Sequence, residues 1–168
     1  YSTRYANMTT RISYAGYACF LLMILPVGAG AQNSERPDIL IADFESENYG
    51  KWLVEGKAFG KGPSRGTLPG QMRVDGFLGK GLVNSFLGGD DSTGSLTSPE
   101  IRIERKWITF LIGGGMNPEK LALQLLVDGK PVRVATGAND RPGGSEALLQ
   151  ESWNVAEFSG KTAVLRII

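Results

Sequence analysis

The spacing of its glycines is the feature of this sequence that most constrains its fold. The 168 residues include 23 glycines, and these separate short runs of β-branched and aromatic residues. Glycine interrupts helices and permits the positive φ angles of tight turns, whereas β-branched and aromatic residues favour strands. No segment keeps an apolar period of 3.6 residues. The pattern therefore predicts an all-β domain, an antiparallel β-sandwich of the jelly-roll type.

The expected strands are short, and one pair of them has a clear hairpin signature. Asp128-Gly129 separates the runs 121–127 and 130–135, and Asp-Gly supplies the positive φ angles of a two-residue type I′ turn. Trp107–Ile112 is continuously apolar, which predicts a central buried strand with Trp107 in the core. Further strands are expected at 39–44, 52–55, 79–84, 95–97, 101–103, 148–155 and 161–168, with one helical turn at 156–160. The sequence stops inside the last strand, so we expect the domain to be truncated there.

The N-terminal region predicts an export signal. Met8–Ala31 contains Arg11, then the apolar run Ala15–Leu25, then small residues up to Ala31. This order is typical of a helical secretory signal peptide. A membrane-anchoring helix is the alternative, but the run is shorter than the about 20 apolar residues that span a bilayer. Residues 1–31 are therefore expected to be upstream sequence and signal peptide, 32–37 a linker, and 38–168 the β-sandwich of a secreted or periplasmic protein.

Missing residue types exclude several classes of site. The chain has no His, and its one Cys, Cys19, lies in the predicted signal peptide. Ser-His-Asp and Cys-His catalysis, and zinc, copper or iron–sulfur centres, are therefore not expected. Removal of Arg4 and Arg11 with the signal leaves 16 Lys plus Arg against 17 Asp plus Glu, a net charge of about −1. This balance argues against nucleic acid or an anionic membrane as the partner.

Four segments together point to a family. The segments are Ile41–Pro63, Ser85–Gly115, Leu125–Glu146 and Ser152–Ile168. The second of them contains the motif GDDSTGSLTSPE followed by FLIGGG. In these segments the chain resembles the N-terminal β-sandwich module of exported bacterial levanases and fructan β-fructosidases, which are glycoside hydrolase family 32 enzymes. The resemblance covers essentially all of 37–168, and it implies a carbohydrate-binding-module-like fold.

The resemblance implies a parent protein that hydrolyses fructans through a downstream catalytic β-propeller. The propeller's motifs are a tryptophan–methionine–asparagine–aspartate–proline–asparagine–glycine segment, an arginine–aspartate–proline segment and a glutamate–cysteine segment, and none occurs in this sequence. The chain is therefore expected to be a non-catalytic accessory domain that binds fructan (levan or inulin) or docks on the propeller. The alternatives are a structural spacer without sugar affinity and an enzyme in its own right.

Carboxylates in two places are candidate ligands. Asp90 and Asp91 lie in the turn-rich segment Gly88–Gly94 and could bind sugar hydroxyls or calcium; the alternative is a solvated turn. Asp43 and Glu45 belong to an expected strand, where both carboxylates would lie on one face and could hold a structural calcium ion. A solvated strand edge and a glycosidase acid–nucleophile pair are the alternatives there. No other cofactor is expected.

Aromatic and loop residues complete the candidate ligand-binding set. Trp52 and Trp153 lie near polar turns and are candidates for stacking on a sugar ring, although a partly buried structural position is favoured for each. Asn139, Arg141 and Glu146, with Asp140 among them, form a polar cluster in a long loop. Loops of sandwich domains commonly carry binding groups, so these residues are secondary candidates, with a solvated loop as the alternative.

Overall fold

A computed structural model describes residues 36–168 of the protein. The predicted signal peptide Met8–Ala31, Cys19 within it and most of the linker lie outside the described residues. Asp38–Ile168 forms one compact unit. None of the helices within residues 36–168 is long and apolar enough to cross a lipid bilayer.

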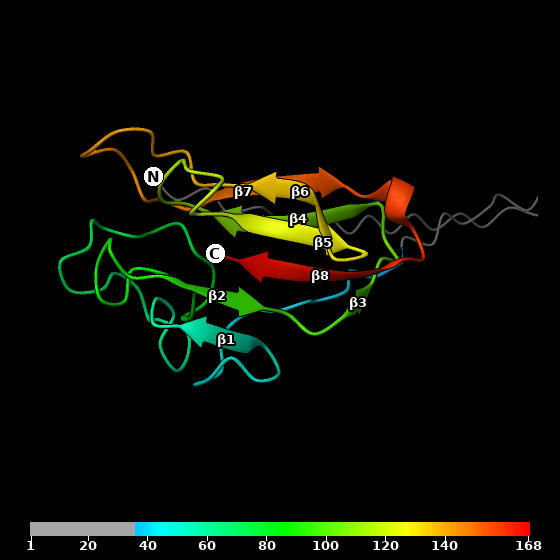
Figure 1. The fold of residues 1–168 in the computed structure, drawn as a ribbon, viewed down its shortest axis with the longest axis horizontal. Coiled ribbons are helices and arrows are strands. Elements are labelled where there is room, and N and C mark those ends of the chain that lie inside the picture. Colours follow the sequence, from blue (N-terminus) through cyan, green and yellow to red (C-terminus); the bar gives the residue numbers. More distant parts are fainter. Residues whose placement is uncertain (1–35) are drawn as a thin grey trace, which may run out of the picture. The chain divides into compact units, whose positions relative to one another are not determined.

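The described chain is built from short antiparallel strands and a single turn of 3-10 helix (Figure 1). The elements are β1 (Leu53–Gly56), β2 (Gly94–Thr97), β3 (Ile101–Arg102), β4 (Trp107–Ile112), β5 (Leu123–Val127), β6 (Lys130–Ala135), β7 (Leu149–Asn154), η1 (Ala156–Phe158) and β8 (Thr162–Ile167). Every strand pairing is antiparallel. The all-β, antiparallel prediction is therefore confirmed.

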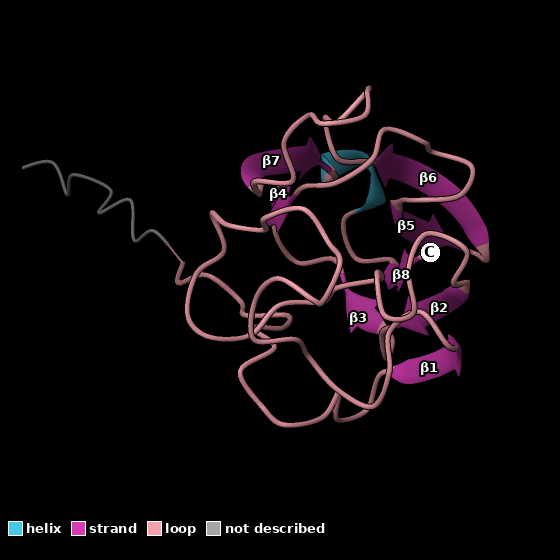
Figure 2. Cartoon of the chain, turned by 90° about the vertical axis from the view of Figure 1, so that its left-hand side faces the viewer, coloured by secondary structure: helices cyan, strands magenta, loops and turns pink. Residues whose placement is uncertain are grey.

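The strands form two sheets that face each other. One is six-stranded, with the order β1-β2-β8-β5-β6 and β3 also paired to β8, and the other consists of β4 and β7. In Figure 1 the larger sheet lies in front of the β4–β7 pair, and Figure 2 looks along the strands with the long loops toward the viewer. Side chains from both sheets share one core cluster, which includes Leu125, Leu165, Trp153 and Val155. This is the predicted sandwich arrangement.

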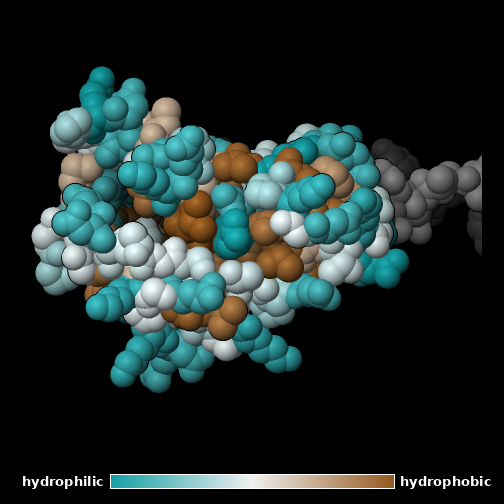
Figure 3. Space-filling view, viewed as in Figure 1, coloured by the Kyte–Doolittle hydropathy of each residue, from teal (hydrophilic) through white to brown (hydrophobic). Residues whose placement is uncertain are grey.

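The hairpin forms where the sequence predicts it. Asp128 and Gly129 connect β5 to β6 with φ angles of 53° and 75°, the two positive values that a type I′ turn requires. Alternation along β5 turns Leu125 and Val127 to the core and Gln124 to the outer face, where Arg166 of β8 donates two hydrogen bonds to Gln124 Oε1 at 3.1 and 2.8 Å. Figure 3 shows this outer face, where apolar and polar side chains are interspersed.

Two expected strands do not form. Residues 39–44 lie outside the sheets, and Ile39, Leu40 and Ile41 are 50%, 73% and 36% exposed. The extended run ends at Phe44, whose φ of 57° is incompatible with a continuing strand. Of residues 79–84 only Leu82 is paired, in an isolated bridge to Ser64. An apolar run becomes a strand only when a sheet edge accepts its backbone groups, and the glycines around 79–84 limit that pairing.

The prediction of a central buried strand with Trp107 in the core is wrong. β4 pairs with β7 alone among the described strands, and Trp107 is 51% exposed. Ile108, Phe110 and Ile112 pack against the core, so the alternating residues Trp107 and Thr109 face outward. A two-stranded sheet of a sandwich has one covered face, which is why continuous apolarity in this run does not imply burial on both faces.

Candidate functional site

The larger of the two surface hollows described here is a groove of about 300 Å³ formed by residues 41–52 and 98–101. We call it the aromatic groove. Its lining residues are Ile41, Ala42, Asp43, Phe44, Ser46, Asn48, Tyr49, Gly50, Lys51, Trp52, Ser98, Pro99 and Ile101. Of the polar members, Asp43, Ser46, Asn48 and Lys51 are exposed and Ser98 is buried, whereas Phe44 and Trp52 are half-buried. The groove thus combines an aromatic wall with a polar rim.

Three aromatic rings form that wall. Phe44 contacts the Trp52 ring edge-to-face at a centroid distance of 5.3 Å, and it contacts Tyr49 at 6.2 Å in the same type of geometry. Both Phe44 and Trp52 also pack on a second core cluster, which is formed by Tyr49, Ala58, Phe59 and Leu96. Edge-to-face pairs of this kind hold rings in fixed positions. The wall is therefore set by core packing and does not depend on a ligand.

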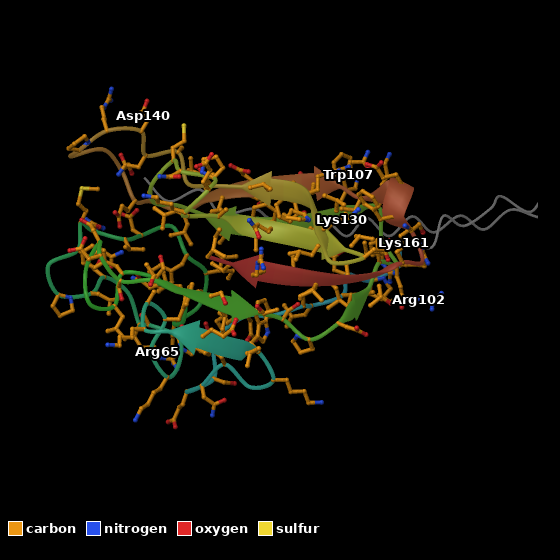
Figure 4. All side chains as sticks on the ribbon, viewed as in Figure 1. Arg65, Arg102, Trp107, Lys130, Asp140 and Lys161 are labelled. Atoms are coloured by element: carbon orange, nitrogen blue, oxygen red, sulfur yellow. The ribbon has the colours of Figure 1, made fainter. Side chains whose placement is uncertain are left out.

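The backbone of Phe44 separates the two carboxylates that flank it. With φ at 57°, Phe44 turns Glu45 toward Lys80 and Gly81, whose backbone N–H groups donate to Glu45 Oε1 at 2.8 and 2.9 Å. These two bonds hold the pKa of Glu45 below its usual value, and the bond from Gly81 has the larger effect. Arg65, labelled in Figure 4, donates to the Glu45 carbonyl oxygen at 3.1 Å. Glu45 thus links the Phe44 segment by hydrogen bonds to the loop that contains Lys80 and Gly81, and it does not line the groove.

Asp43 remains at the groove, and the predicted common face with Glu45 does not form because the segment is not a strand. Asp43 Oδ1 accepts a hydrogen bond from the Glu45 backbone N–H at 3.1 Å. Within residues 36–168 there is no group of three or more His, Cys, Asp or Glu side chains that could hold a metal ion. A calcium ion usually takes six to eight oxygen ligands. Asp43 and Glu45 therefore lack a third acidic partner, and calcium binding at these residues stays a prediction.

Tyr49 contributes its ring to the groove and its hydroxyl to the core. The residue is 5% exposed, and its hydroxyl donates to the Phe59 carbonyl oxygen at 3.0 Å. Burial raises the pKa of Tyr49 to about 12. The phenol therefore stays neutral over the physiological range, and its hydrogen bond anchors the groove to the second core cluster.

The polar rim can supply both donors and acceptors. Asn48 Oδ1 accepts from the Gly50 backbone N–H at 2.9 Å, which orients the amide and leaves its NH₂ group to donate outward. Asp43 offers carboxylate oxygens, and Lys51 offers an ammonium group. An aromatic wall beside such groups suits a ligand ring with an apolar face and polar substituents.

The other candidates from the sequence are dispersed over the molecule. Asp90 and Asp91 are exposed in the turn before β2, and ligand binding by them stays a prediction. Trp153 is 8% exposed and packs on Phe110 at a centroid distance of 4.6 Å, which agrees with the structural alternative given for it. Asn139 and Arg141 line a second hollow, whereas the Glu146 carboxylate accepts a hydrogen bond from Gln71 at 3.0 Å.

Sequence reasoning found Trp52 and Asp43 but missed Phe44, Tyr49 and Asn48, which also line the groove. A signal for them does exist. All five residues lie within ten positions of Asp43, in a segment where aromatic and polar residues interleave.

Comparisons with known proteins give one informative match. No protein-family model and no solved structure matches the chain. The chain is similar to the Aspergillus rugulosus protein named "Putative glycosyl hydrolase ecdE", with 41% identity over 133 residues. The match covers 77% of this chain and 18% of that protein, so the chain spans about a fifth of the length of the curated relative it matches.

Most of this match lies in the compact unit. A share of 77% of 168 residues is about 129, and only 37 residues precede Asp38. At least 92 matched residues therefore belong to Asp38–Ile168. The similarity is one between the β-sandwich and a limited part of a much longer protein.

Proposed function

We propose that Asp38–Ile168 is a non-catalytic accessory module of a secreted fructan-hydrolysing glycosidase, and that its aromatic groove binds the fructan chain. The observation that carries the proposal is the match to a protein named as a glycosyl hydrolase, because it involves a compact β-sandwich and only 18% of that protein. The choice of fructan depends on the resemblance of Ser85–Gly115 and the companion segments to the levanase module. Secretion depends on the pattern of Met8–Ala31.

The groove supports carbohydrate as the ligand class. Sugar rings present C–H faces to aromatic side chains and hydroxyls to polar groups, and the groove places Phe44 and Trp52 beside Asp43 and Asn48. Its open form, with an exposed polar rim, suits a segment of a polymer better than a fully enclosed small molecule.

Docking on the catalytic propeller, as a spacer without sugar affinity, is the second candidate function. Ile39, Leu40 and Ile41 favour it, since they form a consecutive exposed apolar run at the edge of the groove. Exposed apolar surface of this kind marks many contacts between domains.

Isothermal titration calorimetry of the full chain against levan and inulin, with calcium and with a chelator, tests the proposal. We expect heat with at least one fructan. Asp43→Ala and Asn48→Ala should each weaken binding about tenfold, the effect of a lost hydrogen bond that involves a charged or well-oriented group. A loss of binding with the chelator would support the predicted calcium site.

Asp91→Ala is the matched control, because it also removes an exposed carboxylate but outside the groove. Full affinity in this variant is expected. Absence of heat with either fructan would remove the binding role and leave the docking role. Weakened binding in Asp91→Ala with normal binding in Asp43→Ala would move the site to the Gly88–Gly94 turn.

A further inference from the structure

The second hollow lies at the end of the sandwich where the long loops gather. It has a volume of about 240 Å³ and is formed where β4 ends at Ile112, where β7 begins at Leu149, and by the loop that joins β6 to β7. Figure 4 labels Asp140 in that loop. No residue of this end hollow lines the aromatic groove, so the two are separate features of the surface.

The loop around the end hollow is held by backbone hydrogen bonds near its two ends. Asn139 forms a parallel bridge with Gly115, in which the Asn139 N–H donates to the Gly114 carbonyl at 3.0 Å and the Met116 N–H donates to the Asn139 carbonyl at 2.8 Å. Further along, the Leu148 N–H donates to the Asp75 carbonyl at 2.8 Å. The loop that bounds the hollow is therefore anchored at both ends, at Asn139 and at Leu148.

A side-chain network anchors the same loop at Glu146. Gln71 Nε2 donates to the Glu146 carboxylate at 3.0 Å and to Asn84 Oδ1 at 3.2 Å. Asn84 Nδ2 in turn donates to Gln71 Oε1 at 2.8 Å. Asn84 is 6% exposed, so this amide pair belongs to the interior. Glu146 thus helps to position the loop, and it does not line the end hollow.

Asn139 carries a buried acceptor that has no partner. Its Oδ1 atom packs against Gly144, where a Cβ atom would collide with it, and no hydrogen-bond donor reaches it. A buried polar atom without a partner is costly in a folded protein, so such atoms often mark places where a water or ligand completes the bonding. The residue lines the end hollow, but this oxygen faces Gly144 and has almost no accessible surface, so it is a feature of the loop's packing and not a contact for a bound molecule.

The remaining lining defines the chemistry of a ligand. Asp140 and Glu151 bring two carboxylates and Arg141 one guanidinium, while Ile112 and Leu149, which is 59% exposed, are apolar. The excess of negative charge disfavours an anion, and the carboxylates accept hydrogen bonds from hydroxyls. A volume of about 240 Å³ is below the roughly 300–1,000 Å³ of typical small-molecule pockets. The geometry suits one neutral, hydroxyl-bearing ring.

We infer that the end hollow is a second carbohydrate site, which binds a single neutral sugar residue such as the end of a fructan chain. Glu151 and Asp140 accept hydrogen bonds from its hydroxyls, Arg141 donates a hydrogen bond to a ring or hydroxyl oxygen, and Leu149 contacts a C–H face. This inference rests on the proposed function for the ligand class but not for the location, because it uses no residue of the aromatic groove.

Nuclear magnetic resonance of the full chain, titrated with a 2,6-linked fructose disaccharide and in parallel with glucuronate, tests the inference. We expect the disaccharide to shift backbone amide signals within residues 138–151 and glucuronate to leave them unchanged. Glu151→Gln should weaken disaccharide binding about tenfold through loss of a charge-assisted hydrogen bond. The control Asp43→Ala should leave it unchanged.

The failures of the two proposals are distinguishable. Disaccharide shifts confined to residues 41–52, or abolished by Asp43→Ala, would overturn the end site and leave the groove. Disaccharide shifts at 138–151 without any heat from levan or inulin would overturn fructan binding by the groove and retain the end site. Equal shifts with glucuronate, or none with either compound, would refute the inference.

Discussion

Single residues decide which side chains reach the aromatic groove. The left-handed conformation of Phe44 sends Glu45 to the N–H groups of Lys80 and Gly81 and keeps Asp43 at the groove. A non-glycine residue in that conformation costs on the order of 1 kcal/mol, which the surrounding bonds must offset. Local strain at an aromatic residue beside a surface groove is a common mark of functional sites.

Tyr49 gives a prediction at this scale. Its pKa is raised from 10.0 to about 12 by burial, so the unfolded chain loses this proton at lower pH than the folded protein. The stability that results is complete below about pH 10 and is lost as pH rises toward about 12. In Tyr49→Phe the free energy of unfolding should depend less on pH between about 10 and 12. At neutral pH the variant should be less stable by about 1 kcal/mol, because the hydrogen bond to Phe59 is lost.

Urea unfolding of both proteins at about pH 9 and about pH 11.5 measures the difference. The two proteins differ only at residue 49, so the comparison isolates Tyr49. An equally steep decline in the variant would show that the Tyr49 phenol does not contribute.

At the level of elements, the local sequence determines the hairpin turn, whereas the position of each other strand in its sheet depends on the strands that pair with it. Asp128-Gly129 specifies the β5–β6 turn without help from distant residues. By contrast, β8 becomes a central strand only because β2 and β3 pair along one edge and β5 along the other. β4 has its inner face covered through the common core and its outer face open.

The turn yields the second prediction. Gly129→Ala should lower the free energy of unfolding by about 1 kcal/mol, since φ is 75° at this position and open space surrounds the added Cβ. Gly129→Asn is the matched control, because asparagine tolerates the left-handed region, and it should lose less than half as much. Thermal unfolding followed by circular dichroism compares the three proteins, and equal losses for Ala and Asn would contradict the conformational explanation.

At the scale of the whole molecule, two core clusters hold the sandwich together. The first lies between the sheets and centres on Leu125 and Val155, both 0% exposed. The second joins β1, β2 and the groove segment through Tyr49, Phe59 and Leu96. Trp52 packs against both clusters, so the aromatic groove is attached to the interior of the whole unit.

The third prediction concerns the first cluster. Leu125→Ala should reduce the free energy of unfolding by about 2–5 kcal/mol, because it removes buried methyl groups and leaves a cavity. Leu53→Ala, at a strand position that is 59% exposed, should change it by less than about 0.5 kcal/mol. Urea denaturation monitored by tryptophan fluorescence tests the pair, and similar losses would show that Leu125 is not part of the stabilising core.

The sequence by itself determined the fold class, the hairpin, the strands around 107–112, 149–154 and 162–167, and the similarity to part of a protein named as a glycosyl hydrolase. It did so because strand propensity, turn glycines and sequence similarity are local or linear properties. It also singled out Trp52 as a sugar-stacking candidate, Asp43 with Glu45 as calcium ligands, and Asn139 and Arg141 as loop candidates, without placing Trp52 and Asp43 in one site.

Only the tertiary structure decided which faces are covered and which distant residues meet. Alternation along β4 and β7 cannot say that Trp153 is buried and Trp107 exposed until the larger sheet covers one side. Ile112, Asn139 and Leu149 are far apart along the chain and line one hollow only after the strands pair. The physical reason is that burial and site assembly depend on contacts between residues far apart in the chain, and local sequence patterns do not reveal those contacts.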